Sequence, residues 1–283
     1  MIVVTGATGN VGRELVRILA GSDERVRVTA TSRGIGPKDV PPGVRAVPAD
    51  LTDAESLRPV FEGADAVFLQ NGGASLGRIR PRDIVDAAKA GGVRRIVLLS
   101  SQGVATRPES PSHGQAVKAV EDAVREAHAE WTVLRPGGFH SNALAWAASV
   151  RAERVVAAPF GDVGLPSVDP ADIAGVAALA LREPGHAGRI HELTGPAPTT
   201  PRERAEAIAA ALGEPVRFVE LTRQEARAQL PAFLPEPVAD TTLDILGTPT
   251  AAERRVTGEM ERLLGRPALT FADWARRHVE AFR

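Results

Sequence analysis

Residues 2–12 read IVVTGATGNVG and join a short apolar run to a glycine-rich turn. The run Ile2 to Thr5 is mostly β-branched, which is typical of a buried strand, and the residues after Asn10 have the apolar spacing of an amphipathic helix. Glycine is needed where a backbone turns tightly, where it approaches a pyrophosphate and where a helix packs closely on a strand. The turn therefore predicts dinucleotide binding at the N-terminus of the first helix, where free N–H groups attract an anion.

Strand and helix patterns alternate through the first half of the chain. Further strands are expected at residues 26–31, 44–47, 66–69, 96–99 and 131–134. Helices are expected between them, one opened by a capping box at Thr52 and Glu55 and another over about residues 114–129. Strands that are continuously apolar, such as Ile96 to Leu99, indicate a sheet covered on both faces. The pattern predicts a doubly wound α/β domain with a parallel sheet.

The second half of the chain is richer in helix starts. Asp169 and Pro170 suit the N-cap and first position of a helix that reaches about Arg182. Capping boxes begin at Thr200, Thr222 and Thr250. Strands are plausible at residues 190–193 and 216–221. We expect a nucleotide-binding domain over residues 1–195 and a smaller, mostly helical substrate lobe over 196–283. As an alternative, about 140–165 contribute to the substrate lobe.

Composition excludes several classes of function. The 283 residues contain no cysteine, so a disulfide, a thiolate metal site and a thiol nucleophile are all excluded, and redox chemistry needs a borrowed cofactor. The histidines show no ligand spacing, and no metal site is expected. The net charge of −1 gives no field for nucleic acid or an anionic membrane. The longest apolar or small run, Ile173 to Leu181, is far shorter than the roughly 20 residues of a membrane span, and no basic leader is visible, so a cytoplasmic location is expected.

The residues after the second strand indicate which dinucleotide is bound. About 20 residues past the glycine turn, an acidic residue would select NAD by binding the ribose 2′-hydroxyl, whereas an arginine would pair with a 2′-phosphate. The chain has Thr31, Ser32 and Arg33 at this place, with no carboxylate between Arg25 and Lys38. This favours NADPH over NADH. The alternative is that Arg33 is an ordinary surface arginine.

Several motifs together resemble one known family. They are GATGNVG at 6–12, Arg33, VLLSS at 97–101, Lys118 with Glu121, WTVLRPG at 131–137, Asn142 and VDPADIA at 168–174. The chain is similar, essentially from end to end, to the NmrA-like, atypical short-chain dehydrogenase/reductases. The resemblance implies an NADP-binding Rossmann domain with a small helical C-terminal lobe. Quinone reductases, ketone or enone reductases and inactive redox-sensing regulators all occur in this family.

The chain departs from the usual short-chain reductase pattern because it contains no tyrosine. Typical members use a Tyr-x-x-x-Lys pair for proton transfer and for holding the nicotinamide ribose. Lys118 stands at the lysine position, but Gly114 stands where the tyrosine would be. His113 is a candidate proton donor, although a surface or helix-start histidine is the simpler interpretation. The two candidates for catalysis are thus Lys118 and His113.

The resemblance also implies a set of binding residues. Expected cofactor contacts are Gly6, Thr8, Gly9, Asn10, Val11, Gly12, Arg33, Asp50, Leu51, Gln70, Asn71, Gly72, Ser100, Ser101, Lys118, Pro136, Gly137 and Phe139. Expected substrate contacts are Phe139, His140, Asn142 and Trp146. Ordinary packing is an equally good interpretation of Phe139 and Trp146, and Gln70 and Asn71 could be plain turn residues.

A quinone is the substrate least affected by the missing tyrosine, because hydride addition to it gives a delocalised anion. A simple ketone needs general acid catalysis, which is worth about 10² to 10⁴ in rate, whereas an aromatic polyketide ketone beside a phenol could assist itself. The expected activity is an NADPH-dependent reductase of a small aromatic or quinone substrate, acting as a monomer or homodimer. The alternatives are an NADP-binding redox sensor without catalysis and, less favoured, a sugar-nucleotide epimerase.

Overall fold

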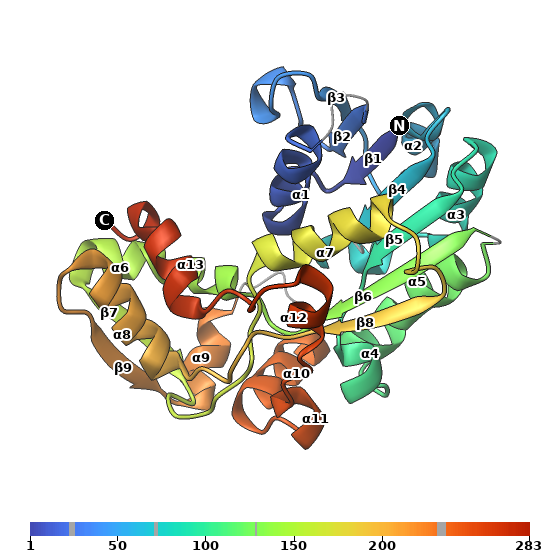
Figure 1. The fold of residues 1–283 in the computed structure, drawn as a ribbon. Coiled ribbons are helices and arrows are strands. Elements are labelled where there is room, and N and C mark those ends of the chain that lie inside the picture. The colour runs from blue at the N-terminus through green and yellow to red at the C-terminus, as the bar shows by residue number, and fades with distance from the viewer. Residues whose placement is uncertain (23–25, 71–72, 128, 231–235) are drawn as a thin grey trace.

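A computed structural model describes residues 1–22, 26–70, 73–127, 129–230 and 236–283. Figure 1 shows a large lobe built on a twisted sheet and a smaller lobe that contains the C-terminus. The sheet has seven parallel strands in the order β3-β2-β1-β4-β5-β6-β8. Their bounds are β1 Ile2–Thr5, β2 Val28–Ser32, β3 Arg45–Pro48, β4 Ala66–Gln70, β5 Arg95–Leu99, β6 Glu130–Pro136 and β8 Arg189–Leu193. The predicted doubly wound parallel sheet is confirmed.

The central position of β1 creates the crevice that such folds use for ligands. Val3 of β1 lies between Thr29 of β2 and Val67 of β4. The chain builds outward from β1 to β2 and β3, and then returns to the other side of β1 to form β4. Ligands of open α/β sheets bind outside the carboxyl ends of the strands at this reversal.

Helices cover both faces of the sheet. One face carries α1 (Asn10–Ala20) and α7 (Pro170–Arg182), and the other carries α2 (Ala54–Phe61), α3 (Pro81–Ala90) and α5 (Ala116–Arg125). In the first layer, Leu15 of α1 and Ile173 of α7 are fully buried. In the second layer, Leu57 of α2 and Val124 of α5 are no more than 1% exposed. Strands buried on both sides explain why the sheet segments read as continuous apolar runs.

The helix starts largely follow the capping signals. Asp169 caps α7 by accepting a hydrogen bond from the Ala171 N–H at 2.9 Å. The capping boxes at Thr200, Thr222 and Thr250 are all present. They open α8 (Pro201–Leu212), α9 (Arg223–Gln229) and α11 (Ala251–Arg254).

The expected box at Thr52 is wrong. Asp53 is the N-cap of α2, because its carboxylate accepts from the Glu55 N–H at 3.1 Å. The Thr52 N–H donates instead to the carboxylate of Asp50 at 2.9 Å, which holds the preceding residues in a turn.

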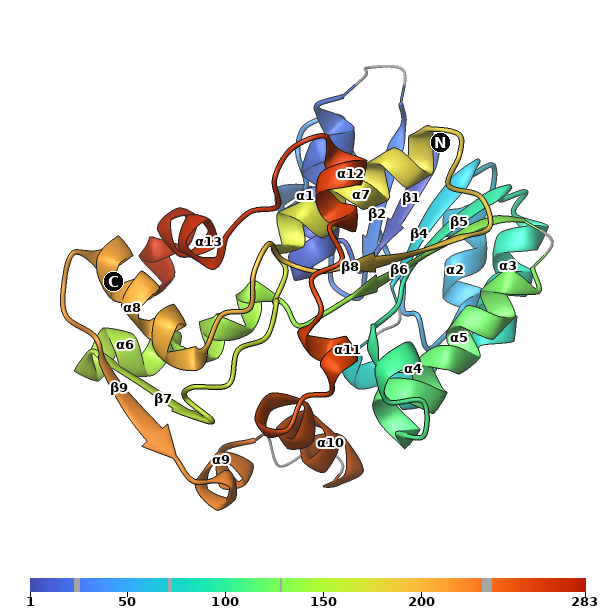
Figure 2. The same ribbon diagram turned by 60° about the horizontal axis from the view of Figure 1, so that its bottom comes forward.

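The smaller lobe is assembled from two distant parts of the chain. Strand β7 (Val155–Pro159), which the sequence pattern does not predict, pairs in parallel with β9 (Arg217–Leu221). Around this pair lie η4 (His140–Trp146), α6 (Ala147–Glu153), α8, α13 (Phe271–Arg277) and η5 (Val279–Ala281) (Figure 2). Their shared core contains the fully buried Trp274. Figure 2 also shows α9 and α10 (Glu236–Gly247) at the lower edge of this lobe.

The C-terminal part of the chain also returns to the large lobe. Helix α12 (Glu259–Leu264) packs on α7 and β8, and its Met260 joins the core beneath α1 and α7. The domain boundary at residue 195 stays a prediction. Helix α12 lies after this boundary in the sequence but packs on the large lobe. The remaining short elements are η1 (Pro37–Asp39), η2 (Gly73–Arg78), α4 (Gly103–Thr106) and a π-helical turn, η3 (Pro111–Gln115).

The described residues contain neither a helix suited to a membrane nor a cluster suited to a metal ion. None of their helices combines the length and the apolar character that crossing a membrane requires. No group of three or more histidine, aspartate or glutamate side chains in those residues is placed to hold a metal ion.

Candidate active site

The glycine-rich turn between β1 and α1 has a backbone geometry that glycine adopts far more readily than other residues. Gly6 has a φ of +61°, in the left-handed region that favours glycine. A Cβ atom at Gly12 would lie 2.2 Å from the carbonyl oxygen of Gly6, because the first turn of α1 packs directly on the end of β1. The Gly9 N–H closes the turn by donating to the Gly6 carbonyl at 2.9 Å.

The N-terminus of α1 is available to an anion. Its N-cap, Gly9, makes no side-chain capping hydrogen bond, and the first turn contains no acidic residue. Asn10 does not cap the helix, since its amide donates to the Ser141 hydroxyl at 2.9 Å. The first N–H groups of an 11-residue helix and the positive end of its dipole are therefore offered to a ligand at the turn.

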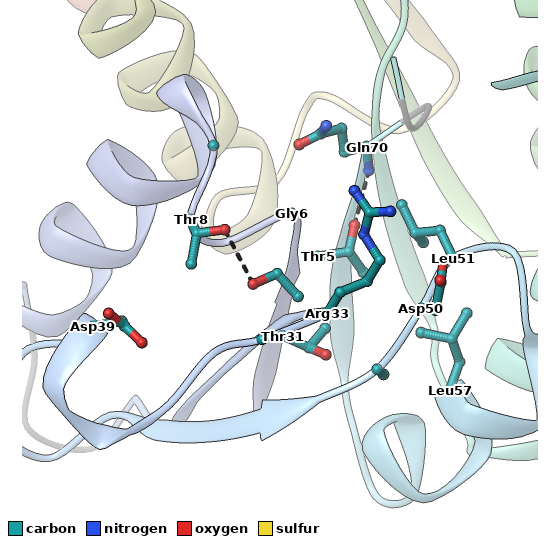
Figure 3. Close-up of a pocket in the computed structure, with 14 residues that line it drawn as sticks. Thr5, Gly6, Thr8, Thr31, Arg33, Asp39, Asp50, Leu51, Leu57 and Gln70 are labelled. Carbon is teal, nitrogen blue, oxygen red and sulfur yellow. Dashed lines mark hydrogen bonds between the residues drawn. The ribbon is translucent and has the colours of Figure 1, made fainter. Parts of the chain in front are cut away.

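A cavity of about 450 Å³, here called the β1 pocket, opens beside this turn. Figure 3 shows it at the carboxyl ends of β1, β2 and β4. It is lined by Thr5, Gly6, Thr8, Gly9, Thr31, Ser32, Arg33, Gly34, Asp39, Ala49, Asp50, Leu51, Leu57 and Gln70. The cavity thus gathers seven of the expected cofactor contacts. It lies where the strand order reverses, beside the uncapped N-terminus of α1 and with Arg33 in its lining, which suits a phosphate-bearing ligand.

The cationic group of the β1 pocket is Arg33, which follows β2 directly. Figure 3 shows its side chain rising into the pocket toward Gln70 and Leu51. Arg33 is exposed, and it makes no hydrogen bond or ion pair with any described residue. Hydrogen bonds from Thr52, together with the charge of Arg33, hold the pKa of Asp50 below its usual value. Asp39, a lining residue that sequence reasoning missed, accepts the Gly36 N–H at 2.8 Å in its own turn.

A second cavity of about 190 Å³, here called the β5 pocket, lies at the ends of β5 and β6. Its lining comes from both halves of the chain. The residues are Ser101, Gln102, Gly103, Thr106, His113, Gly137, Gly138, Asn142, Leu165, Pro166, Thr242, Ile245, Leu246 and Glu253. Ser101, His113, Gly137 and Asn142 were expected from sequence. The α10 side chains and Glu253 were not, because nothing local to residues 236–253 indicates a cavity whose other walls lie within residues 101–166.

His113 is held in the β5 pocket by a closely packed backbone. It lies in the π-helical turn η3, a rare element that is frequent at functional sites. The Ser110 hydroxyl accepts the His113 N–H at 3.2 Å. A Cβ at Gly103 would lie 2.6 Å from the His113 carbonyl oxygen, and one at Gly114 would lie 2.2 Å from the Arg107 carbonyl oxygen. Gly114, which replaces the usual tyrosine, is therefore required by packing. Burial lowers the pKa of His113, so its imidazole is neutral at pH 7.

A buried ion pair joins the two walls of the β5 pocket. Arg107, at the end of α4, donates to both carboxylate oxygens of Glu253, at 2.8 and 2.9 Å. The same guanidinium donates to the Thr248 carbonyl at 3.1 Å. The Glu253 side chain is completely buried. This pair fixes α10 and α11 against α4, and so it holds the α10 side chains over the pocket.

Several expected contacts lie just behind these pockets. Ser100 is buried and donates to Glu121, whose carboxylate is also bound by Arg135 at 2.6 and 2.9 Å. Pro136 is buried at the end of β6. Phe139 forms a bridge with Val168. These residues support the carboxyl ends of β5 and β6.

The remaining expected residues divide between the helix surface, the core and the undescribed part of the chain. Lys118 is not brought to either pocket, because it is exposed on α5 and its ammonium binds Asp122, four residues along the helix, at 2.5 and 2.8 Å. Trp146 packs against the core of the smaller lobe. Asn71 and Gly72 lie outside the described residues.

The structure assigns His140 to the core and not to substrate binding. Its side chain is buried, and its two ring nitrogens lie 2.9 Å from the Ser167 hydroxyl and 3.3 Å from the Leu269 carbonyl. Phe271 packs edge-on against the ring. Burial lowers the pKa of His140 to about 4.

This buried histidine predicts a loss of stability in mild acid. Because the folded-state pKa of about 4 lies below the unfolded value near 6.5, the stabilisation is complete above pH 6.5 and is lost as the pH falls toward 4. We expect about 2 kcal/mol of the unfolding free energy to disappear between pH 7 and pH 5 through His140. Urea unfolding at the two pH values measures it. His140→Gln should remove that part of the pH dependence. If the unfolding free energy of the variant fell between pH 7 and pH 5 as much as that of the wild type, the assignment would be contradicted.

A doubly wound sheet with an uncapped glycine turn and an arginine after its second strand defines a dinucleotide-binding protein of the Rossmann type. The comparison with known families gives the same class, because the model of a family described as "NAD(P)H-binding" matches residues 6–184. The chain belongs to this NAD(P)H-binding family. The resemblance to NmrA-like, atypical short-chain reductases is confirmed.

Characterised relatives extend over the whole chain. The chain is 38% identical to a (4-alkanoyl-5-oxo-2,5-dihydrofuran-3-yl)methyl phosphate reductase of Streptomyces griseus, over 100% of this chain and 99% of the relative. It is 32% identical to an NAD(P)H azoreductase of Xenophilus azovorans, over 100% and 99% of the two chains. The crystal structure of an Escherichia coli NADPH-dependent quinone oxidoreductase complexed with NADPH superposes with a TM-score of 0.79, at 26% identity and over 98% and 99% of the chains. The protein is thus an NAD(P)H-dependent reductase, and its cofactor is NADP(H).

Proposed function

We propose that this reductase transfers hydride from NADPH to a conjugated, electron-poor acceptor, namely a quinone or the carbonyl of an aromatic, polyketide-type compound. The observation that carries the proposal is the β5 pocket, which lies on the same strand edge as the β1 pocket and contains a histidine but no phenol. Bound NADPH would supply the hydride. The residues of the chain then have to bind, orient and stabilise the two molecules.

The absence of tyrosine favours acceptors that need little proton transfer in the transition state. An alkoxide formed from a simple ketone is strongly basic, and general acid catalysis of its formation is worth about 10² to 10⁴ in rate. Hydride addition to a quinone gives an anion that is delocalised over the ring. The relatives support this class, since their names specify a quinone, an azo compound and a furanone, all of them conjugated acceptors.

His113 would take over part of the role of the missing tyrosine. A neutral imidazole carries one N–H that can donate to an oxygen on which negative charge develops. The packing of Gly103 and Gly114 fixes the backbone that carries this ring. Ile245, Leu246 and Leu165 supply the apolar walls of the pocket, which suit a flat ring and exclude water.

A panel of acceptors tests the proposed function. Purified protein is incubated with NADPH and either a quinone, a polyphenolic ketone or an unconjugated cyclic ketone, while absorbance of the reduced nicotinamide is followed. We expect turnover of the conjugated acceptors and none of the unconjugated ketone. Tight NADPH binding without turnover of any acceptor would contradict the proposal and would favour the redox-sensor alternative.

The role of His113 gives a separate prediction. His113→Leu should lower kcat for a quinone by about 10- to 100-fold, because a donor aimed at the developing anion is lost, while the Kd for NADPH should stay unchanged. His186→Leu is the matched control, since His186 precedes β8 and so lies at the opposite edge of the sheet. Equal kcat values for the two variants would remove His113 from the reaction.

A further inference from the structure

The β5 pocket provides no free positive charge. Among its described lining residues there is no lysine or arginine, and its ionisable residues are His113 and Glu253. The neighbouring cation is Arg107, which is 22% exposed. Its guanidinium is already held by both oxygens of Glu253 and by the Thr248 carbonyl. It is therefore committed to the contact between α4 and the α10–α11 segment.

Neither of the two ionisable lining residues offers a positive charge to an anionic group. Burial raises the pKa of Glu253, but the hydrogen bonds from Arg107 outweigh it and keep the pKa below its usual value, so Glu253 is a carboxylate at pH 7. Burial also lowers the pKa of His113, which leaves this ring without charge. A phosphate, sulfonate or carboxylate group entering the pocket would lose its hydration and find no cation to replace it.

From this arrangement we infer that the β5 pocket selects uncharged acceptors and rejects acceptors that carry an anionic group. The inference rests on the proposed function, because it concerns the substrate of the same site. It also separates this chain from its Streptomyces griseus relative, whose named substrate carries a phosphate ester. The expected substrate is a neutral quinone or neutral conjugated carbonyl compound.

A pair of quinones of the same ring size tests the inference. 1,4-Naphthoquinone is neutral, and 1,4-naphthoquinone-2-sulfonate carries one negative charge while its electron-withdrawing group makes the ring the better hydride acceptor. With NADPH and wild-type protein, we expect kcat/KM to be at least about tenfold higher for the neutral quinone, since binding must overcome the lost hydration of the sulfonate. Equal or faster turnover of the sulfonate would overturn the inference while leaving the proposed function intact.

A second test of the inference introduces a positive charge at the β5 pocket. Leu246 lines the pocket and is 37% exposed, so an arginine there can reach the mouth without being buried. The quantity compared is kcat/KM for the sulfonate divided by kcat/KM for the neutral quinone. This ratio should be about fivefold or more higher in Leu246→Arg than in Leu246→Gln. The glutamine variant is the control, because it removes the same apolar side chain without adding charge. NADPH titration confirms that both variants are folded. An unchanged ratio would overturn the inference.

Binding distinguishes failure of the inference from failure of the proposed function. If neither quinone is reduced, the proposed function fails. Calorimetry of the two quinones with NADP⁺-loaded protein then still measures charge selection at the β5 pocket. Weaker binding of the sulfonate supports the inference, and equal or tighter binding contradicts it.

Discussion

Gly12→Ala is expected to abolish NADPH binding at micromolar concentrations, lowering the affinity by about 100-fold or more, because the turn can no longer close on a diphosphate. A Cβ at this position would lie 2.2 Å from the Gly6 carbonyl oxygen and 2.9 Å from the Ala7 Cα. All the atoms it meets belong to the backbone, so the turn or the helix has to move. Fluorescence titration with NADPH measures the affinity, and urea unfolding should show a cost of about 1–3 kcal/mol.

Gly21→Ala is the matched control for this substitution. Gly21 lies at the other end of the same helix, with a φ of −88°. A Cβ there would meet its nearest neighbour, the Arg17 carbonyl oxygen, at 3.5 Å, which is ordinary contact. We expect the control to bind NADPH like the wild type. Wild-type affinity in Gly12→Ala would contradict the assignment of the turn.

Arg33→Asp is expected to reverse the cofactor preference. A charge-assisted hydrogen bond contributes about 1.5–3 kcal/mol, so losing the guanidinium should weaken NADPH by roughly 10- to 100-fold, and the new carboxylate adds repulsion. NADH has no 2′-phosphate, and its affinity should change by less than about threefold. Parallel titrations with the two cofactors measure the ratio.

The same strand supplies the control for the arginine. Arg27 is exposed and stands immediately before β2, whereas Arg33 stands immediately after it. Arg27→Asp makes the same change of charge at the opposite edge of the sheet and should leave the preference intact. An equal loss of NADPH and NADH affinity in Arg33→Asp would show that Arg33 does not read the 2′-phosphate.

The backbone features around the candidate nucleotide site could be predicted from sequence because their determinants are local. Gly6, Gly12 and Arg33 each lie at the end of an element whose apolar pattern is clear, and parallel strands bring those ends to one edge. The capping signals at Asp169 and Thr200 were equally local. The failure at Thr52 has a local cause as well, since two adjacent residues compete to cap α2 and Thr52 binds Asp50.

The acceptor half could not be predicted in the same way. The β7–β9 pair joins residues about 60 positions apart, and short strands of that kind have no pairing signal in the sequence. The roof of the β5 pocket comes from α10, which is fixed by the Arg107–Glu253 pair across 146 positions. In the sequence, Glu253 is recognisable only as the end of a capping box. His140 shows the opposite error, because a histidine that follows a glycine turn resembles a ligand until its burial is known.

The central claim is that the turn at residues 6–12 holds the diphosphate of NADPH. Calorimetric titration of the wild-type protein with NADPH and with NADH tests it most directly. We expect a Kd for NADPH of about 1–10 μM and binding of NADH that is at least about tenfold weaker. Failure of both cofactors to bind at millimolar concentration would contradict it.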